Sequence, residues 1–317
     1  MIQGNAGGGN GNTLTNITSY SNGVGVQIEG GGGNTLSGGN IGYNPSPNAG
    51  NQAIPSPFGN KGHGVLILGG SRNTISRIVS SGNGLAGVAI VNPIDRNPAT
   101  RPTANIVQDS VLGLDPTKQS QAGNLYGVFT QDAASTLIQR NTIGGNGRFG
   151  IYLQQSDGAR VVDNVVGVSD SGHKGKNPGA NLDGAYATGN YGDGVFVSDT
   201  PNVLISGNAI AGNAYPVKKK DQVYVNPPYS PANSRRIFRQ SFLGNGIHLS
   251  GEKTRQTQIL NNRIGLTRAG VQKANQAFAI LVDTGATYRT IAGNQFRTSD
   301  YAREITVYDL TKLGKKA

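Results

Sequence analysis

The sequence predicts an all-β solenoid, in which a short unit of strands and turns is repeated and stacked along one axis. Glycine followed by a β-branched residue, any residue and another apolar residue recurs along the whole chain. Each copy is followed by a second phrase, close to Asn-x-Ile-x-x-Asn-x-Ile-Gly. Both phrases alternate with a period of two, and no window shows the apolar period of a helix. Repetition and alternation together therefore predict the fold class.

The first phrase provides a set of anchors along the chain. They begin at Gly25, Gly64, Gly87, Gly127, Gly150, Gly194 and Gly246, with degenerate copies at Ala279 and Glu304. The first six anchors are separated by 39, 23, 40, 23 and 44 residues. Long and short steps alternate, so we expect about nine turns, with plain turns alternating with loop-bearing ones. The clearest copy, 141–167, predicts strands at 150–153 and 159–167.

A plain unit of 23 residues cannot bury its apolar side alone, but units stacked in parallel about 4.8 Å apart can. Gly and Asn at the junctions are expected to supply the positive φ angles of sharp turns. The repeat resembles the parallel β-helix repeat of the pectate-lyase-like superfamily, and 111–128 is similar to a loop of large bacterial surface β-helix proteins. This resemblance and the crossover rule for parallel strands both imply a right-handed parallel β-helix. The superfamily includes lyases, hydrolases, epimerases, tailspikes and non-catalytic passengers, so the resemblance implies a fold rather than one activity.

We expect residues 1–317 to form a single β-helix domain, because the core of a solenoid is one continuous rod. Residues 12–25 align with 73–87, so the first turn starts without a capping element. From this we expect Met1 to begin a fragment of a longer chain. Two segments depart from the repeat, namely a basic and aromatic insertion at 214–243 and a basic tail at 310–317.

The composition limits the chemistry and favours acidic partners. Cysteine is absent, which excludes disulfides, Cys-based zinc sites and a thiol nucleophile. The formal net charge of +11 favours an anionic polysaccharide or an acidic protein as partner, ahead of nucleic acid. No apolar run is long enough to span a membrane, and no signal peptide is recognised. The resemblance implies an extracellular or cell-surface location, and an intracellular one stays open.

The variable third position of each anchor phrase should face outward and stack into one column. Its members are Gln27, Leu66, Ala89, Phe129, Tyr152, Phe196, His248, Leu281 and Thr306. The four consecutive ring-bearing members, from Phe129 to His248, predict a ladder suited to sugar rings or to a protein interface. Two alternatives are that flanking loops cover these rings, or that the in/out phase is reversed and the rings belong to the core.

The insertion at 214–243 supplies a second candidate binding surface. Its basic residues are Lys218, Lys219, Lys220, Arg235, Arg236 and Arg239, and they are interleaved with tyrosines and a phenylalanine. Such a segment could dock onto an acidic partner within a larger assembly. The alternative is a solvated loop that packs on the rod through its tyrosines.

An acidic residue follows most of the anchor strands. These residues are Asp132, Asp157, Asp199, Glu252 and Asp283. Carboxylates on successive coils could act as general acid and base, and Asp157 and Asp199 are the candidate ligands for Ca²⁺. The alternative is local turn chemistry. No other metal and no other cofactor is expected.

A third column, Asp109, Arg140 and Asp163, predicts a surface ion ladder.

The absence of any complete catalytic motif, the positive charge and the ring column favour a non-catalytic role. The first hypothesis is a secreted or surface module that binds or scaffolds an anionic glycan or an acidic protein. The second is a lyase, epimerase or hydrolase acting on an acidic polysaccharide, with a catalytic set drawn from Asp132, Asp157, Asp199, Arg148 and His248. The third is a structural subunit that docks through the basic insertion.

Overall fold

The fold was analysed on a computed structural model of the chain. It describes residues 2–3, 10–42, 59–93, 98–116, 122–167, 189–213, 244–275, 277–296 and 307–309. Much of the sequence between the more widely spaced anchors falls on 43–58, 117–121, 168–188 and 214–243. These segments and the tail at 310–317 therefore lie outside the described residues.

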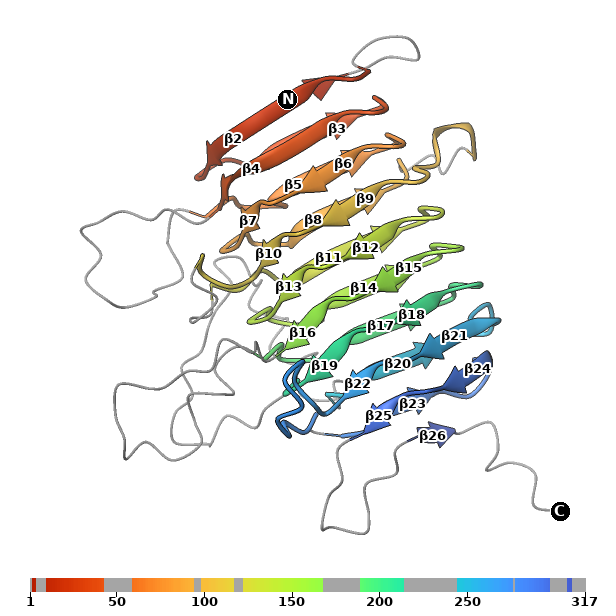
Figure 1. Ribbon diagram of the computed structural model, residues 1–317. Helices are drawn as coiled ribbons and strands as arrows, with labels where there is room; N and C mark the ends of the chain where they lie inside the picture. Colours follow the sequence, from red (N-terminus) through yellow and green to blue (C-terminus); the bar gives the residue numbers. More distant parts are fainter. Residues whose placement is uncertain are drawn as a thin grey trace, which may run out of the picture.

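The described residues form two parallel β-sheets (Figure 1). Sheet A contains β1 (Ile2–Gln3), β3 (Val26–Glu29), β5 (Val65–Leu68), β8 (Ala86–Val91), β11 (Tyr126–Gln131), β14 (Ile151–Gln154), β17 (Val195–Ser198), β20 (Ile247–Ser250), β23 (Ile280–Val282) and β26 (Val307–Asp309). The first row of sheet B contains β2 (Thr13–Ser19), β4 (Thr35–Ile41), β6 (Thr74–Ser76), β9 (Ile106–Gln108), β12 (Leu137–Gln139), β15 (Arg160–Val162), β18 (Leu204–Ser206), β21 (Thr257–Leu260) and β24 (Tyr288–Ala292). Its second row contains β7 (Val79–Ser80), β10 (Val111–Leu112), β13 (Thr142–Ile143), β16 (Val165–Gly167), β19 (Ala209–Ala211), β22 (Arg263–Ile264) and β25 (Gln295–Phe296).

Each coil passes through one strand of sheet A and then through sheet B before the next coil begins, so strands far apart in sequence pair in parallel. Strand β14, for example, lies between β11 and β17. Every intact anchor phrase lies at a strand of sheet A, as predicted. A single short 3₁₀ helix, Pro98–Thr100, occurs in the described part, and no helix there is long and apolar enough to cross a membrane.

The strand predicted at 159–167 is divided into β15 and β16 by a sharp corner at Asp163. Asp163 has a φ of 55°, in the left-handed region. The same corner on other coils is also left-handed, with positive φ at Asn16, Gly38, Arg77, Asp109, Arg140, Gly207, Asn261 and Gly293. A stacked column of left-handed residues therefore bends every coil between the two rows of sheet B.

The anchor glycines are required by close packing rather than by a positive φ. Gly194 has no positive φ, but a Cβ added to it would lie 2.6 Å from Ile210 Cγ2 and 2.8 Å from Asn213 Nδ2. Glycine is needed there because the backbone passes too close to the core and to a buried asparagine for any side chain. Positive φ angles occur, as expected, at other junction glycines such as Gly82 at 72° and Gly145 at 67°, and also at the corners.

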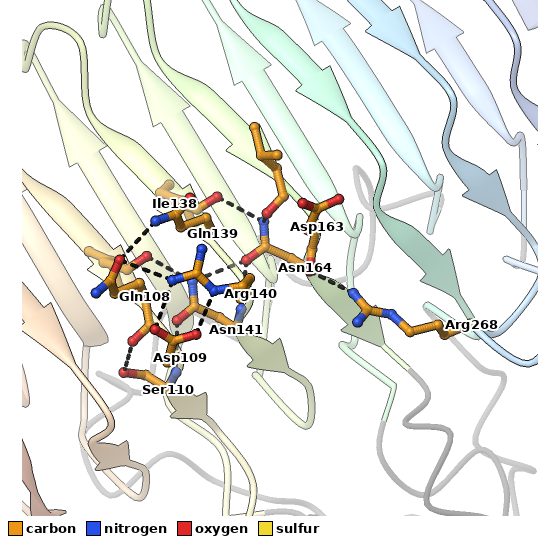
Figure 2. Close-up of polar contacts among 12 residues, drawn as sticks. Gln108, Asp109, Ser110, Ile138, Gln139, Arg140, Asn141, Asp163, Asn164 and Arg268 are labelled. Carbon is orange, nitrogen blue, oxygen red and sulfur yellow. Dashed lines mark hydrogen bonds and ion pairs between the residues drawn. The ribbon is translucent and has the colours of Figure 1, made fainter.

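The interior combines aliphatic side chains with ladders of buried asparagines. On β14, Ile151 and Leu153 are fully buried and pack in the same core as Val161 and Val166 of sheet B. One asparagine ladder directly follows the corner, and its members are Asn141, Asn164, Asn208, Asn262 and Asn294. Each side-chain amide donates to the amide oxygen of the next coil, with distances between 2.9 and 3.0 Å (Figure 2 shows the first two members). The ladder satisfies polar groups that would otherwise be buried without partners.

Candidate functional site

The predicted ring column is present on the outer face of sheet A. Phe129, Tyr152, Phe196 and His248 pair directly on successive strands. We call these four residues the ring ladder. Their ring centroids are 5.2, 5.1 and 4.8 Å apart in that order. All four side chains are partly exposed whereas the residues on either side of them are buried, so the predicted in/out phase is confirmed.

Three other members of the predicted column differ from expectation. Leu281 pairs with Tyr308, so the final position belongs to Tyr308 and not to Thr306. A slip of two residues keeps the inward and outward alternation unchanged, and the apolar pattern therefore could not distinguish these two registers. Ala89 and Leu281 hold the expected register, but their side chains are buried rather than exposed.

A second ring column, Tyr126 and Phe149, lies beside the ring ladder and was not predicted. The Tyr126 ring is 5.6 Å from Phe129, and the Phe149 ring is 4.8 Å from Phe196. Each of the two residues directly precedes an anchor glycine, which is the sequence signal that could have revealed the column. Phe149 is only 2% exposed and packs under the ring ladder, whereas Tyr126 is partly exposed beside it.

Arg148 places a positive charge against the second ring column. Its guanidinium carbon lies 5.1 Å from the centroid of Phe149, and its Nη1 donates a 2.9 Å hydrogen bond to the hydroxyl of Tyr126. A guanidinium over an aromatic face is attracted to the ring electrons. The predicted candidate Arg148 therefore lies beside the ring ladder, held by its contacts with Tyr126 and Phe149.

The ring ladder ends at a histidine held between two carboxylates. His248 Nδ1 lies 2.9 Å from Asp193 Oδ2, and Nε2 lies 3.0 Å from Asp283 Oδ2. We call these three residues the histidine clamp. Since both ring nitrogens face carboxylate oxygens, both must donate, and the arrangement fits the imidazolium form. Burial alone would lower the pKa of His248, but the hydrogen bonds and charges of Asp193 and Asp283 outweigh it and raise that pKa above its ordinary value.

Asp193 is the deepest member of the histidine clamp and was missed by the sequence analysis. It is 2% exposed, and its Oδ1 accepts hydrogen bonds from the backbone N and the side-chain Nδ2 of Asn245 at 2.7 and 2.9 Å. These bonds fix the carboxylate and, through it, the orientation of the His248 ring. The sequence signal was again the position before an anchor glycine, here Gly194.

The predicted acidic residues do not form one row. Asp132 and Asp199 hold equivalent corner positions with Gln155 between them, whereas Asp157 lies two residues further along its coil. Asp132 instead forms a 3.0 Å ion pair with Arg101, and Asp157 accepts a 2.8 Å hydrogen bond from Asn202. Among the predicted acids in the described part of the chain, Asp283 alone hydrogen-bonds His248.

No group of three or more metal-binding side chains occurs in the part of the chain that the structure describes. The candidate Ca²⁺ ligands Asp157 and Asp199 lie on neighbouring coils but at different positions along them. Asp132, Asp157 and Asp199 of the predicted catalytic set thus do not gather around His248, which is held by other carboxylates. The basic residues of the insertion, from Lys218 to Arg239, lie outside the described residues.

The third predicted column is present at the corner of sheet B (Figure 2). Arg140 binds the Asp109 carboxylate through Nε at 2.7 Å and Nη2 at 2.9 Å. The hydrogen bond and charge of Arg140 lower the pKa of Asp109. Asp163 follows on the next coil, and its backbone oxygen accepts a 2.7 Å hydrogen bond from Arg268.

A family model described as Right handed beta helix region matches residues 4–172 and 126–296. The chain belongs to the right-handed β-helix family. This membership confirms the predicted fold and its handedness. Comparison with curated protein sequences finds no match.

Solved structures with the same architecture include proteins that act on polysaccharides. The A-module of a mannuronan C-5 epimerase from Azotobacter vinelandii has a TM-score of 0.55 at 16% identity, covering 90% of this chain and 58% of the module. An alginate lyase from Paenibacillus sp. str. FPU-7 has a TM-score of 0.44 at 14% identity, covering 94% of this chain and 98% of the lyase. The tailspike protein of Dettilon has a TM-score of 0.42 at 15% identity, covering 94% of this chain and 60% of the tailspike. This right-handed β-helix thus spans less than two thirds of the epimerase module, and at such identities the likeness establishes the fold alone.

Proposed function

We propose that this right-handed β-helix binds a polysaccharide along sheet A, with the ring ladder as its platform. The observation that carries the proposal is the unbroken series of partly exposed rings from Phe129 to His248. Aromatic faces stack on the apolar faces of sugar rings, and parallel strands repeat the platform at every coil. A linear polymer of sugars suits such a repeating surface better than a compact ligand does.

Polar groups at both ends of the ring ladder suit the hydroxyl and charged groups of a sugar chain. Arg148 supplies hydrogen-bond donors beside Tyr126, while the half-exposed Asp283 carboxylate supplies acceptors at the other end. The formal charge of +11 favours an acidic polysaccharide. Only part of this charge lies in the described residues, which include 13 basic and 11 acidic residues. The expected preference for acidic sugars therefore depends on the net charge of the whole chain, whereas the expected stacking of sugar rings depends on the ring ladder.

The first experiment is a glycan-array measurement on the purified protein, with acidic and neutral polysaccharides and with detection of cleaved uronates. Binding to acidic polysaccharides without cleavage supports the proposal. An absence of binding to every polysaccharide contradicts it and favours an acidic protein as partner. The mannuronan C-5 epimerase module has the same fold, so mannuronan and other polyuronates belong on the array.

A catalytic role is the second candidate, and the histidine clamp is the observation that favours it. A buried carboxylate that orients an imidazole at the edge of a binding surface is an arrangement used for general acid–base catalysis. The imidazolium of His248 could donate a proton to a glycosidic oxygen of a chain lying on Phe196. For this transfer, the hydrogen bond between His248 Nε2 and the more exposed Asp283 would first have to break, so that Nε2 could donate to the substrate instead.

Replacing Asp193 by Asn tests the catalytic candidate, since it removes the charge that orients His248 and keeps the shape of the side chain. The catalytic candidate predicts cleavage of an acidic polysaccharide by the native chain, at least a tenfold slower reaction for Asp193→Asn, and unchanged binding. Asp283→Asn serves as a second variant, because Asp283 is more exposed and its replacement perturbs folding less. No cleavage by the native chain on any bound polysaccharide contradicts the catalytic candidate and leaves the binding role intact.

An extracellular or cell-surface location accompanies the proposed function, because extended polysaccharides are encountered there. The docking role of the insertion at 214–243 stays a prediction, since its residues lie outside the described part of the chain. Deleting 214–243 and measuring polysaccharide binding separates the two surfaces. We expect the ring ladder to retain its ligand in the deletion variant.

A further inference from the structure

The corner of sheet B carries a regular alternation of charge that the proposed function does not use. Arg77, Asp109, Arg140 and Asp163 occupy the same corner on four successive coils, and backbone hydrogen bonds of 3.2 Å from Arg77, Asp109 and Arg140 set this register. We call these four residues the corner column; Figure 2 shows the last three. All four are exposed. The charges therefore run plus, minus, plus, minus in steps of about 4.8 Å.

Contacts inside the chain hold most of these side chains in place, but they do not use every charged group of the column. Arg140 binds Asp109 in the same molecule, and Arg77 Nη2 donates a 2.6 Å hydrogen bond to Ser37. The Asp163 carboxylate has no hydrogen-bond or ion-pair partner among the described residues. The left-handed backbone fixes the position of each member, with φ angles between 53° and 55°.

The corner column is complementary to itself when a second copy approaches in the opposite direction. Rotation by half a turn about an axis across the rod exchanges the first position with the fourth and the second with the third. Arg77 then faces the partner's Asp163, and Asp109 faces the partner's Arg140, so every contact joins opposite charges. Two copies running in the same direction would instead place like charges against each other. The charge order thus selects one of the two symmetric arrangements.

A column of small side chains, three valines and one threonine, lies next to the corner column on the same four coils. It consists of Val79, Val111, Thr142 and Val165, which pair in register and are all partly exposed. The rotation that matches the charges also brings this column into contact with the equivalent column of the second copy. Apolar contact could supply binding free energy there, while exposed ion pairs contribute little and mainly determine orientation.

We propose that the corner column and its neighbouring apolar column form a self-association surface, on which a second copy of this chain docks antiparallel. The contact covers four coils, so the dimer is weak and depends on protein concentration. Its charge pairing makes it weaker at high salt. The ring ladder lies on sheet A, so an antiparallel pair would present two separate polysaccharide platforms.

A charge exchange within the corner column tests this proposal by sedimentation equilibrium. Arg77→Asp and Asp163→Arg should each weaken self-association about tenfold, because each disrupts two symmetric pairs. The double variant R77D and D163R should restore the native dissociation constant. Residues 77 and 163 are three coils, or about 14 Å, apart in one chain, so rescue can arise only through a second copy. Arginine suits position 163 because Arg77 and Arg140 have the same left-handed backbone.

Arg160→Asp is the matched control, since it makes the same charge change at an exposed position of β15 outside the corner column. We expect it to leave self-association unchanged. A chain that stays monomeric up to its solubility limit overturns the proposal. So does a dimer that is insensitive to both single variants, or one that the double variant fails to restore.

Discussion

Two histidines of this chain experience opposite environments. His63 directly precedes an anchor glycine, and its Nδ1 accepts a 3.2 Å hydrogen bond from the backbone N of Ala86. Burial lowers the pKa of His63 to about 4, so it is neutral at pH 7. His248 is also largely buried, yet the two carboxylates of the histidine clamp raise its pKa. The same side chain is therefore a neutral packing element at one position and a cation at the other.

These environments predict distinct titrations, which can be followed by NMR of the imidazole protons. We expect a midpoint near pH 4 for His63 and a midpoint above the ordinary value of about 6.5 for His248. His63→Gln and His248→Gln assign the two signals, with His173 as the third. Equal midpoints near 6.5 for both residues would contradict the two environments.

The same shifts determine how stability depends on pH. The folded pKa of His63 is lower than its unfolded value, so its contribution is retained above about pH 6.5 and lost as pH falls to about 4, by about 3 kcal/mol. The folded pKa of His248 is higher than its unfolded value, so its contribution is present below about pH 6.5 and lost as pH rises through the folded pKa.

At the scale of the element, the asparagine ladders compensate for very short strands. Strands such as β13 and β22 contain only two residues, and a parallel pair of that length has few hydrogen bonds of its own. Asn164 links three coils, because it accepts from the Asn141 amide at 3.0 Å, donates to Asn208 at 3.0 Å and donates to the Ile138 carbonyl at 2.9 Å. The ladder thus fastens the corner of each coil to the next.

Replacing Asn164 by Ala should lower the free energy of unfolding by about 2–4 kcal/mol, because it leaves buried donors and acceptors on both neighbouring coils without partners. Asn294→Ala is the matched control at the end of the same ladder, where the side chain is only partly buried. We expect the control to lower the free energy of unfolding by only about 1 kcal/mol. Urea unfolding followed by circular dichroism measures both, and equal losses would show that the ladder adds nothing at its centre.

At the scale of the whole molecule, the sequence predicted the repeat, the two-residue alternation and the outward ring ladder. These features depend on local patterns that every coil repeats. The register of the last strand was predicted incorrectly, because a shift from Thr306 to Tyr308 leaves the alternation intact. The buried Asp193 was missed because its partners, Asn245 and His248, are brought to it by stacking, and no local pattern encodes that contact.

The acidic residues show the same limit of prediction from sequence, here within single turns. Asp132, Asp157 and Asp199 each follow a strand by one to three residues, and the sequence suggested a single row. Stacking places Asp157 out of step with the other two, because Gln155 holds the equivalent position on its coil and Asp157 comes two residues later in a turn of the same length. A spacing error of two residues in a turn is enough to separate groups that chemistry would need side by side.

The most direct test of the account is the affinity of an acidic polysaccharide for a variant that lacks two rungs of the ring ladder, measured by isothermal titration calorimetry. Tyr152→Ala combined with Phe196→Ala should weaken binding about tenfold or more, with little change in stability, because both rings are partly exposed. Leu204→Ala is the control, since Leu204 is a partly exposed outward residue of β18 in sheet B. An affinity unchanged by the double variant, or lowered equally by the control, would contradict the proposed site. Loss of folding in the double variant would show that the rings belong to the core.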